Sequence, residues 1–309
     1  MSWSLDTESG LLEITGSGEM NGYTHYSNTP WYNYKSYIKE CNIKNGITTI
    51  GANAFYECYS LTNVTIPKSI TTIGSQAFYN CTGLKNIYIS DLAAWCNISF
   101  RGYTYGSSPA NPLYYAQHLY LNGEEIKDLV IPNGVSTIKD YAFNGFKGLT
   151  SVTIPNSVTT IGNTAFYFCT GLTDITIPNS VTMIGNDAFH NTNWYNNQPD
   201  GIIYLGNHFY DFKGTMPQNT VINIKEGTTT IASCAFSSCT GLSSITIPNS
   251  ITTIGNYTFS GCTGLKSITI PNDLTIIGNC AFYNCTGLTE ITIPNNVTTI
   301  GDDAFYNCI

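Results

Sequence analysis

A phrase of 23 residues recurs along most of the chain. Its clearest copy, LTSVTIPNSVTTIGNTAFYFCTG, runs from Leu149 to Gly171, and the next copy starts at Leu172. A fixed period of about 20 to 50 residues predicts a solenoid in which each copy forms one coil stacked on the last. Such a chain is expected to be a scaffold or binding surface rather than an enzyme. A phenylalanine marks each copy, 23 residues from its neighbour within three groups: Phe55 and Phe78; Phe143, Phe166 and Phe189; Phe236, Phe259, Phe282 and Phe305.

The alternation of residues within one copy predicts how it forms a coil. Val152 and Ile154 alternate with polar residues, which is typical of a half-buried strand. Pro155 ends that strand, because proline cannot donate to a sheet ladder. A second extended stretch ends at Gly162, and Asn163 is expected to cap a short helical turn that carries the marker phenylalanine.

Composition limits the classes of partner. Charged residues make up only 10% of the 309 residues, against about a quarter in ordinary soluble proteins, so uncharged polar side chains must cover the surface. The net charge of -8 and the pI near 4.8 leave no basic surface for nucleic acid. No apolar run approaches the ~20 residues of a membrane helix. The start, MSWSLDTESG, lacks the pattern of an export signal, which predicts an intracellular protein or a mature segment of a longer precursor.

The cysteines follow the repeat. Stacked coils would place their thiols in a column at about 4.8 Å, so disulfides or a metal are alternatives to free thiols. Phe146 and Thr192 occupy the same position in two copies, which favours buried free thiols that pack as small apolar groups. The sequence has no C-x-x-C pair and no histidine at zinc-like spacing, so we expect no metal. Seven of the 11 cysteines lie three residues after a marker: Cys58, Cys81, Cys169, Cys239, Cys262, Cys285 and Cys308.

The phrase LTxITIPNSVTTIGxxAFxxCTG resembles the BspA-type (Treponema pallidum type) leucine-rich repeat over nine copies, from residues 47–55 to residues 297–305. The opening WSLDTESGLLEITGSGEM, followed by Pro30-Trp31-Tyr32, is similar to the N-terminal cap of that family. The resemblance implies a leucine-rich-repeat solenoid: a right-handed coil with a parallel sheet on the concave face and short helical or 3-10 turns on the convex face. It also implies a bacterial or protozoal surface or secreted protein used in adhesion, and hence an extracellular or cell-surface location.

The repeat rhythm predicts an N-terminal cap at residues 1–42 and a solenoid at residues 43–309, with insertions at about 90–127 and 190–220. The cap is expected to be a β-hairpin of residues 3–6 and 11–15. The first insertion is expected to contain a short helix at 92–96 and a hairpin turning at Asn122-Gly123, and the second a hairpin turning at Gly206-Asn207. The chain stops inside a repeat, so we expect either a segment boundary or a surface for self-association there.

Aromatic residues gather in the two insertions. Insertions in repeat arrays map to loops that often carry the binding site, and tyrosine and tryptophan are favoured at interfaces. These aromatics form either a contact set for protein or glycan, or the packing that holds each insertion to the solenoid. They are Tyr103, Tyr105, Tyr114, Tyr115, Trp194 and Tyr195.

The first strand of each copy turns two polar positions outward. Threonine suits an exposed strand and pairs with itself across strands, so the resulting column has a purely structural interpretation. The functional interpretation is a shallow polar trough that binds an extended protein or sugar, with the variable neighbour setting specificity. Ice binding is disfavoured, because the acidic neighbours make a poor template for water. The pairs are Asn63/Thr65, Asn86/Tyr88, Ser151/Thr153, Asp174/Thr176, Ser244/Thr246, Ser267/Thr269 and Glu290/Thr292.

Motifs for catalysis are absent from the sequence. The four histidines form no H-E-x-x-H or i,i+4 pair, and neither a G-x-S-x-G elbow nor a phosphate loop occurs. Gly16-Ser17-Gly18 is read as a turn rather than a dinucleotide site, because the next glycine comes too late. The acidic pairs Asp302-Asp303 and Glu124-Glu125 lie in turns and are read as solvated charge rather than calcium ligands. No catalytic residue and no cofactor is expected.

These patterns predict a non-enzymatic adhesion or protein-interaction module that binds a protein or glycan through the concave face and the inserted loops. The alternative is a structural spacer or an auxiliary region of a larger exported enzyme. Neither nucleic acid nor membrane insertion is expected, and self-association through the C-terminal end stays open. The candidate ligand-binding residues are Asn63, Thr65, Tyr88, Tyr103, Tyr105, Thr153, Asp174, Thr176, Trp194, Tyr195, Thr246, Thr269, Glu290 and Thr292.

Overall fold

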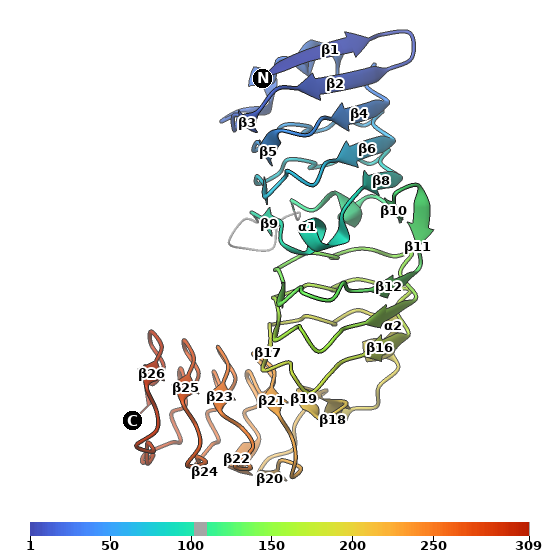
Figure 1. Ribbon diagram of the computed structural model, residues 1–309. Helices are drawn as coiled ribbons and strands as arrows, with labels where there is room; N and C mark the ends of the chain where they lie inside the picture. The colour runs from blue at the N-terminus through green and yellow to red at the C-terminus, as the bar shows by residue number, and fades with distance from the viewer. Residues whose placement is uncertain (102–109, 309) are drawn as a thin grey trace. The chain divides into compact units, whose positions relative to one another are not determined.

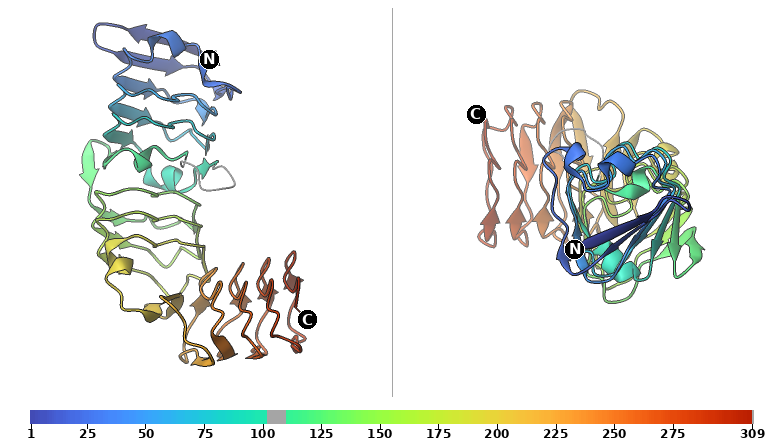
Figure 2. Two further views of the ribbon diagram at one scale, coloured as in Figure 1. Left: turned by 180° about the vertical axis from the view of Figure 1, so that it is seen from behind. Right: turned by 90° about the horizontal axis from the view of Figure 1, so that it is seen from above.

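The computed structural model describes residues 1–101 and 110–308, which form stacked coils (Figure 1). Two compact units are present: one of residues 1–153, 164–175 and 189–196, and one of residues 154–163, 176–188 and 197–309. Each is a repeat solenoid whose equivalent strands run parallel, as the sequence predicts. Seen from above, the blue coils of the first unit lie one over another (Figure 2). Whether the cap ends at residue 42 stays a prediction.

The first unit carries a seven-stranded sheet along one side. Its strands, in spatial order, are β1 (Ser2–Asp6), β2 (Leu11–Thr15), β4 (Glu40–Ile43), β6 (Asn63–Ile66), β8 (Asn86–Ile89), β10 (His118–Leu121) and β11 (Glu124–Ile126). β1 pairs antiparallel with β2, and β2 pairs parallel with β4, so the predicted cap hairpin is confirmed and extends the sheet. A second sheet consists of β3 (Gly18–Glu19), β5 (Ile47–Ile50), β7 (Thr72–Ile73) and β9 (Ser99–Phe100).

The later copies repeat both strands. The first strand recurs as β12 (Asp128–Val130), β14 (Ser151–Thr153), β16 (Asp174–Thr176), β20 (Thr220–Asn223), β22 (Leu242–Thr246) and β24 (Ser267–Thr269). The second recurs as β13 (Thr137–Ile138), β15 (Thr160–Ile161), β17 (Met183–Ile184), β21 (Thr230–Ile231), β23 (Thr253–Ile254), β25 (Ile276–Ile277) and β26 (Thr299–Ile300). The hairpin of the second insertion is β18 (Gly201–Leu205) and β19 (His208–Lys213), as predicted.

Helices occur, among the described residues, only in the cap and the insertions. They are the 3-10 helices η1 (Tyr26–Asn28), η2 (Tyr32–Tyr34) and η3 (Pro112–Tyr114), and the α-helices α1 (Leu92–Cys96) and α2 (Asn193–Asn196). The helix predicted at 92–96 is therefore confirmed. The hairpin predicted at Asn122-Gly123 is also confirmed, and both turn residues have positive φ, as a type I' turn requires.

The marker phenylalanines form continuous columns inside each unit. In the first unit, Phe55 and Phe78 stack at 5.1 Å between ring centroids, and Phe166 stacks on Phe189 at 5.2 Å. In the second unit, Phe236 and Phe259 stack at 5.2 Å and within 9° of parallel. All six rings are fully buried. Aromatic pairs contribute about 0.5–1.5 kcal/mol beyond the area they bury, so each column joins neighbouring coils along the axis.

Turns rather than helix surround each marker phenylalanine. In the first coil, Asn53 and Glu57 both have positive φ, and two such residues four apart cannot belong to a right-handed helix. The pattern recurs two residues before and two after each later marker. The backbone N–H groups of Asn53, Phe55 and Glu57 donate to carbonyls of the following coil, at 2.7 to 3.1 Å. Every bond in this ladder therefore points the same way along the solenoid.

The asparagine predicted to cap a helical turn has a different role. Asn163 Oδ1 accepts a hydrogen bond from the backbone N–H of Asn186 in the next coil, at 2.8 Å. In the same way, Asn256 Oδ1 accepts from the Asn279 N–H, and Asn279 Oδ1 accepts from the Asp302 N–H, each in the following coil. These side chains therefore join coils instead of closing a turn within one coil.

The cap satisfies the acceptors that the first coil presents. Because the ladder points forward, the carbonyls of Ala52 and Ala54 face the N-terminal side with no preceding repeat to bind them. The Tyr23 N–H donates to Ala52 O at 3.0 Å, and the Trp31 indole Nε1–H donates to Ala54 O at 2.8 Å. Trp31 also stacks on Phe55 at 5.6 Å, so one side chain terminates both the ladder and the phenylalanine column.

The first insertion satisfies the hydrogen-bonding groups of the coil before it and of the coil after it. The Tyr115 hydroxyl accepts from Asn80 N–H at 2.8 Å, where a following coil would supply a carbonyl. On its other side, Trp95 Nε1 and Asn111 Nδ2 both donate to Ala142 O at 2.9 Å. Trp95 thus repeats the contact that Trp31 makes in the cap. This packing role was one of the two interpretations open for the insertion tyrosines, and Tyr115 has it.

The second insertion caps its repeats with phenylalanine. Phe209, from β19, packs on Phe236 with 4.6 Å between centroids and the rings tilted by 31°, and it is fully buried. The N–H of Phe212, from the same strand, donates to Ala235 O at 3.1 Å. The hairpin therefore takes the place of a preceding coil in both the phenylalanine column and the hydrogen-bond ladder.

The column cysteines are free thiols. Cys81 Sγ donates to Phe55 O at 3.0 Å, and Cys262 and Cys285 make the same contact with the marker of the preceding coil. All 11 cysteines are unpaired. Burial raises the pKa of the Cys58 thiol to about 12 and that of Cys285 to about 12. The prediction of buried free thiols is confirmed for five of the seven column cysteines, whereas Cys239 and Cys308 are free but only half-buried.

Truncation of a column phenylalanine should cost far more stability than truncation of its near neighbour. Phe166→Ala removes a fully buried ring and should lower the free energy of unfolding by about 3–5 kcal/mol. Phe168→Ala, two residues away, removes a ring that is 38% exposed and should change stability by about 0.5 kcal/mol or less. Urea unfolding followed by circular dichroism measures both. Equal losses would contradict the column as the main axial contact.

Acid should destabilise the second insertion through His208. Its imidazole is fully buried, with Nε2 3.1 Å from Pro178 O and Nδ1 3.2 Å from Thr229 Oγ1, and burial lowers its pKa below the ordinary 6.5. A depressed pKa means that the folded protein favours the neutral imidazole. The contribution of His208 to the free energy of unfolding is therefore complete above pH 6.5 and is lost as the pH falls below that value. His208→Gln should therefore show a smaller drop in melting temperature between pH 7.5 and 5.5 than wild type. Parallel pH profiles for the two proteins would contradict this.

Thiol reactivity should depend on unfolding. Because the reactive species is the thiolate, thiols with pKa values raised to about 12 should react slowly with Ellman's reagent at pH 8 in the folded protein. In denaturant without reductant, all 11 thiols should react within the mixing time. Fewer than 11 reactive thiols after unfolding would reveal disulfides, and rapid reaction of most thiols before unfolding would contradict their burial.

Candidate ligand-binding face

The outward side chains of the seven-stranded sheet form two columns in the first unit, which we call the polar face. The register of β2, β4, β6, β8 and β10 aligns the first column as Leu11, Glu40, Asn63, Asn86 and His118. The second column, two residues further along each strand, is Glu13, Asn42, Thr65, Tyr88 and Tyr120. The strand residues between the two columns point inward and are buried. The sequence thus brings three predicted site residues, Asn63, Thr65 and Tyr88, onto adjacent strands.

A chain of amide hydrogen bonds runs along the first column. Asn86 Nδ2 donates to Asn63 Oδ1 at 2.8 Å, and Asn63 Nδ2 donates to Glu40 Oε1 at 2.7 Å. Both bonds point toward the Glu40 carboxylate, and bonds aligned head to tail polarise one another. Among the described residues, the second carboxylate oxygen of Glu40 accepts no hydrogen bond. The column therefore holds its polar groups in fixed positions and leaves acceptor capacity at Glu40.

The second column contains a stacked tyrosine pair. Tyr88 and Tyr120 lie 4.9 Å apart, with their rings 21° from parallel. Tyr120 belongs to the hairpin of the first insertion, where it lies opposite Glu125 of β11. Glu125 bonds to the His118 imidazole, which lowers the pKa of the carboxyl group, and its other oxygen lies 3.6 Å from Lys127 Nζ. The insertion thus supports one face of Tyr88.

A groove of about 340 Å³ lies beside the tyrosine pair. It is lined by Tyr88, the columns that precede it and one edge of the cap hairpin: Leu11, Glu40, Cys41, Asn42, Asn63 and Thr65. The step from the large ring of Tyr88 to the small Thr65 and Asn42 creates the hollow. Burial raises the pKa of Tyr88, and Tyr120 and Glu40 add to the effect, so the phenol stays protonated and can donate a hydrogen bond.

Threonine hydroxyls divide into two groups. Those at the start of the strands donate to the carbonyl of the preceding coil: Thr62 to Lys39 O, Thr150 to Lys127 O, and Thr275 to Thr252 O, at 2.9 to 3.0 Å. The outward threonines behave differently. In the part of the chain that the structure describes, the hydroxyls of Thr65, Thr153, Thr176, Thr246, Thr269 and Thr292 have no partner within the protein, and all but the half-buried Thr65 are exposed.

The remaining residues predicted on first strands are divided between the two units, and all but Glu290 and Thr292 lie on strands. Thr153 and Asp174 belong to the first unit and Thr176 to the second. Thr246 and Thr269 pair with each other across β22 and β24. Glu290 and Thr292 lie on an extended segment outside any strand, and a groove of about 460 Å³ separates that segment from β24. Their predicted role in binding stays a prediction.

The aromatic residues of the insertions are placed differently from one another. Trp194 stacks edge-on against Phe189 at 6.3 Å, and Tyr195 is only 9% exposed and lies 4.1 Å from His190. Both therefore pack against the solenoid, in keeping with the structural interpretation of these residues. Tyr103 and Tyr105 lie outside the described residues.

The site residues that sequence reasoning missed come from the cap edge and the first insertion. They are Glu40, Asn42, His118, Tyr120 and Glu125. The repeat phrase is degenerate at these positions, and only the pairing of β8 with β10 places Tyr120 beside Tyr88. Alternation in the stretch HLYL around Tyr120 was the available signal.

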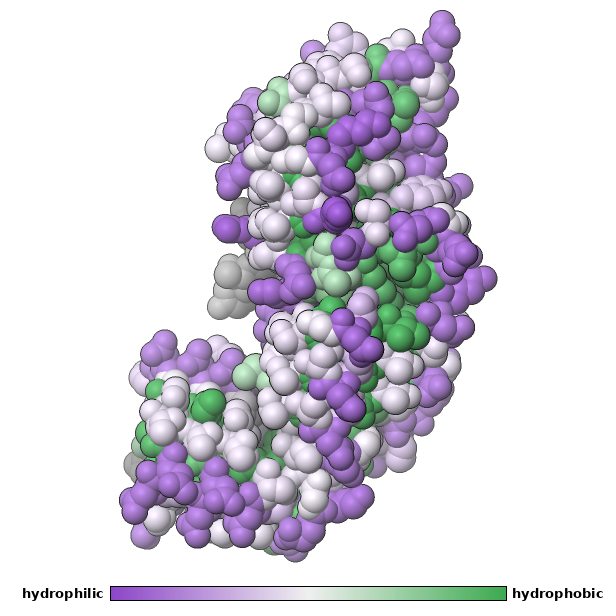
Figure 3. Space-filling view, in the orientation of Figure 1, coloured by the Kyte–Doolittle hydropathy of each residue, from purple (hydrophilic) through white to green (hydrophobic). Residues whose placement is uncertain are grey.

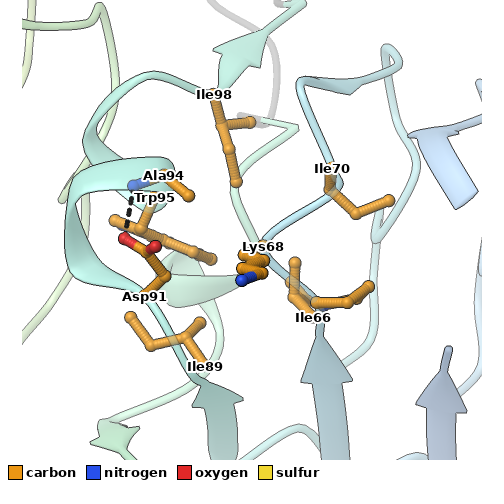
Figure 4. A pocket seen from close by; sticks show the side chains of 9 residues that line it. Ile66, Lys68, Ile70, Ile89, Asp91, Ala94, Trp95 and Ile98 are labelled. Carbon is orange, nitrogen blue, oxygen red and sulfur yellow. Dashed lines mark hydrogen bonds between the residues drawn. The ribbon is translucent and has the colours of Figure 1, made fainter. Parts of the chain in front are cut away.

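A second hollow lies where α1 meets the coil before it, but side chains fill it. Figure 4 shows Ile66, Ile89 and Trp95 converging there, while Asp91 caps α1 by accepting from the Ala94 N–H at 2.9 Å. The hollow leaves no room for a water molecule. Within residues 1–101 and 110–308, no group of three or more His, Cys, Asp or Glu side chains could hold a metal ion. The described helices include none that is long and apolar enough to span a membrane.

Comparison with solved structures finds bacterial proteins that align with nearly the whole of this chain. A leucine-rich repeat protein from Eubacterium ventriosum shares 23% identity, over 99% of this chain and 92% of that one, with a TM-score of 0.37. A leucine rich cell surface protein from Faecalibacterium prausnitzii shares 24% identity over 99% and 90%, with a TM-score of 0.37. The pneumococcal vaccine antigen PcpA shares 17% over 97% and 78%, with a TM-score of 0.34. Among curated proteins, no relative matches.

Family comparison gives a direct match. The model of the BspA type leucine rich repeat region matches residues 28–107, 116–213 and 207–309, in six copies. These ranges reach both units and include the second insertion, the first insertion apart from residues 108–115, and the part of the cap that contains Trp31. The chain belongs to the BspA-type leucine-rich-repeat family.

Proposed function

We propose that the chain is a non-enzymatic adhesion or interaction module that binds its partner reversibly through the outward faces of the first strands. The observation that carries this proposal is the contrast between the two groups of threonines. Threonines at the start of the strands donate their hydroxyls to backbone carbonyls of the preceding coil. The hydroxyls of the outward column are unpaired, and all but that of the half-buried Thr65 belong to exposed residues. A surface of this kind offers neutral hydrogen bonds in a regular row.

Family membership supports the same class of function, because repeat proteins of this kind are interaction modules with extended surfaces. A location on the cell surface or outside the cell belongs to the proposal. The competing function is a spacer that holds another domain at a distance. A spacer has no use for a preorganised amide chain or a supported tyrosine pair, so the polar face favours binding.

Substitution of the outward column should abolish adhesion. The variant Thr153→Glu, Thr246→Glu, Thr269→Glu places charge on the strand faces, and beads coated with it should bind an epithelial cell layer at least about tenfold less than wild type. The control Thr82→Glu, Thr170→Glu, Thr263→Glu adds the same charge in the turns after the cysteines and should bind normally. Equal binding by both variants, or no binding by wild type, would contradict the proposal.

Salt should have little effect on wild-type adhesion. A steep loss between low and moderate salt is typical of charge-driven association, whereas a neutral row of hydroxyls and amides predicts a nearly flat response. Repeating the bead assay over a range of sodium chloride concentrations measures this. A steep decline would contradict binding through the threonine column.

A further inference from the structure

We infer that the groove beside Tyr88 is a binding site for a neutral carbohydrate, with one sugar ring stacked on the free face of the tyrosine. This inference rests on the proposed function and names the class of ligand for one part of the polar face. The site lies wholly within the first unit, on β2, β4, β6 and β8.

The aromatic wall of the groove has one face available. Tyr120 covers one side of the Tyr88 ring at 4.9 Å, and the other side borders the hollow above Thr65. An aromatic face carries partial negative charge, and the C–H bonds on one side of a pyranose carry partial positive charge, so the two surfaces attract. Support from Tyr120 holds the ring in place before the ligand arrives, which lowers the entropic cost of binding.

The floor and the far wall supply the polar groups that sugar hydroxyls need. Asn63 and Thr65 form the floor, with Glu40 and Asn42 beyond them on β4. The amide chain from Asn86 through Asn63 to Glu40 fixes the orientation of these groups, and Glu40 keeps a carboxylate oxygen for a pair of adjacent hydroxyls. A few placed polar groups around an aromatic platform are the usual composition of a small-ligand site.

Charge favours a neutral sugar over an acidic one. Glu40 is the charged side chain that lines the groove. On the same face, Lys44 is held by Glu13 at 2.7 Å, and Lys127 lies 3.6 Å from Glu125, so both cations are paired. A sialylated or sulfated glycan would bring a like charge toward Glu40. The volume of about 340 Å³ is at the lower end of the ~300–1,000 Å³ of ligand pockets, which suits a short stretch of an oligosaccharide.

The lining of the groove is mostly polar and has few apolar side chains. Figure 3 shows hydrophilic and intermediate residues over much of the surface that faces the viewer, together with a hydrophobic area at mid-height on its right-hand side. A peptide ligand that relied on apolar anchors would need a larger apolar surface than the groove lining offers. Leu11 is the aliphatic side chain at its edge.

The test measures binding of the purified full chain to an array of neutral, sialylated and sulfated oligosaccharides. Wild type should bind a subset of the neutral ones and none of the acidic ones. Tyr88→Ala should weaken that binding by about tenfold or more, whereas Tyr88→Phe, which keeps the ring, should retain most of it. Circular dichroism shows whether each variant is folded.

A second variant keeps the test decisive if Tyr88→Ala misfolds. Thr65→Tyr fills the hollow with a ring and should abolish binding. The matched control Thr82→Tyr makes the same change at an exposed turn position outside the groove lining and should leave binding intact. Wild type that binds no neutral oligosaccharide, or binding that survives both Tyr88→Ala and Thr65→Tyr, would overturn the inference.

The cell-layer assay separates this inference from the proposed function. Periodate cleaves vicinal diols, so mild periodate treatment of the cells should remove the part of adhesion that depends on Tyr88. Adhesion that depends on the threonine column but resists periodate would overturn the carbohydrate site and leave the interaction module standing. If a protein ligand binds through Tyr88 instead, protease treatment of the cells would abolish adhesion and periodate would not, which also overturns the carbohydrate site.

Discussion

The hydrogen-bond ladder beside the phenylalanine columns constrains everything else in this molecule. Two residues with positive φ flank each marker phenylalanine, and this geometry turns alternate N–H groups toward the next coil and alternate carbonyls toward the previous one. Each coil therefore presents acceptors on one side and donors on the other. Stability is shared between neighbours, as expected for a solenoid, because one coil buries too little alone.

The direction of the hydrogen-bond ladder explains which groups the cap and the insertions present to the coils beside them. A group that precedes a coil must donate hydrogen bonds, and Trp31, Trp95 and Phe212 all do so to the equivalent carbonyls of their coils. A group that follows a coil must accept, as the Tyr115 hydroxyl does. The first insertion meets both requirements and, through β10 and β11, also supplies Tyr120 and Glu125 to the polar face. The same segment thus repairs the repeat and shapes the candidate site.

Much of this fold could be predicted from the sequence, because the period of 23 residues and the alternation around Val152 and Ile154 report the coil directly. The cap hairpin, the short helix and both inserted hairpins follow from local turn chemistry in the same way. The conformation around the phenylalanine was harder to predict. Residues such as Thr164 and Phe168 rarely adopt positive φ, and a hydrogen bond from the Phe168 N–H to His190 O of the next coil supports this conformation. The sequence pattern predicts that Asn163 caps a turn in its own coil, because such a local pattern does not reveal its hydrogen bond to the next coil.

The candidate site was predicted only in part. Asn63, Thr65 and Tyr88 lie on regular repeats, so their common face follows from the period. Glu40 and Tyr120 lie outside the regular copies, in the cap edge and the insertion, and their positions depend on which strands pair. Strand pairing across an irregular segment is a long-range property that a local pattern does not encode.

The one-way ladder also limits how such a gene can change in length. Because each coil offers a donor edge to the next coil's acceptor edge, any copy fits against any other, and gain or loss of a whole copy during replication leaves both junctions satisfied. An insertion or deletion of any other length moves the next phenylalanine out of the column. It then needs an adaptor such as the segment that carries Trp95 and Tyr115. Selection can therefore lengthen or shorten the array by recombination, while each adaptor must be retained intact.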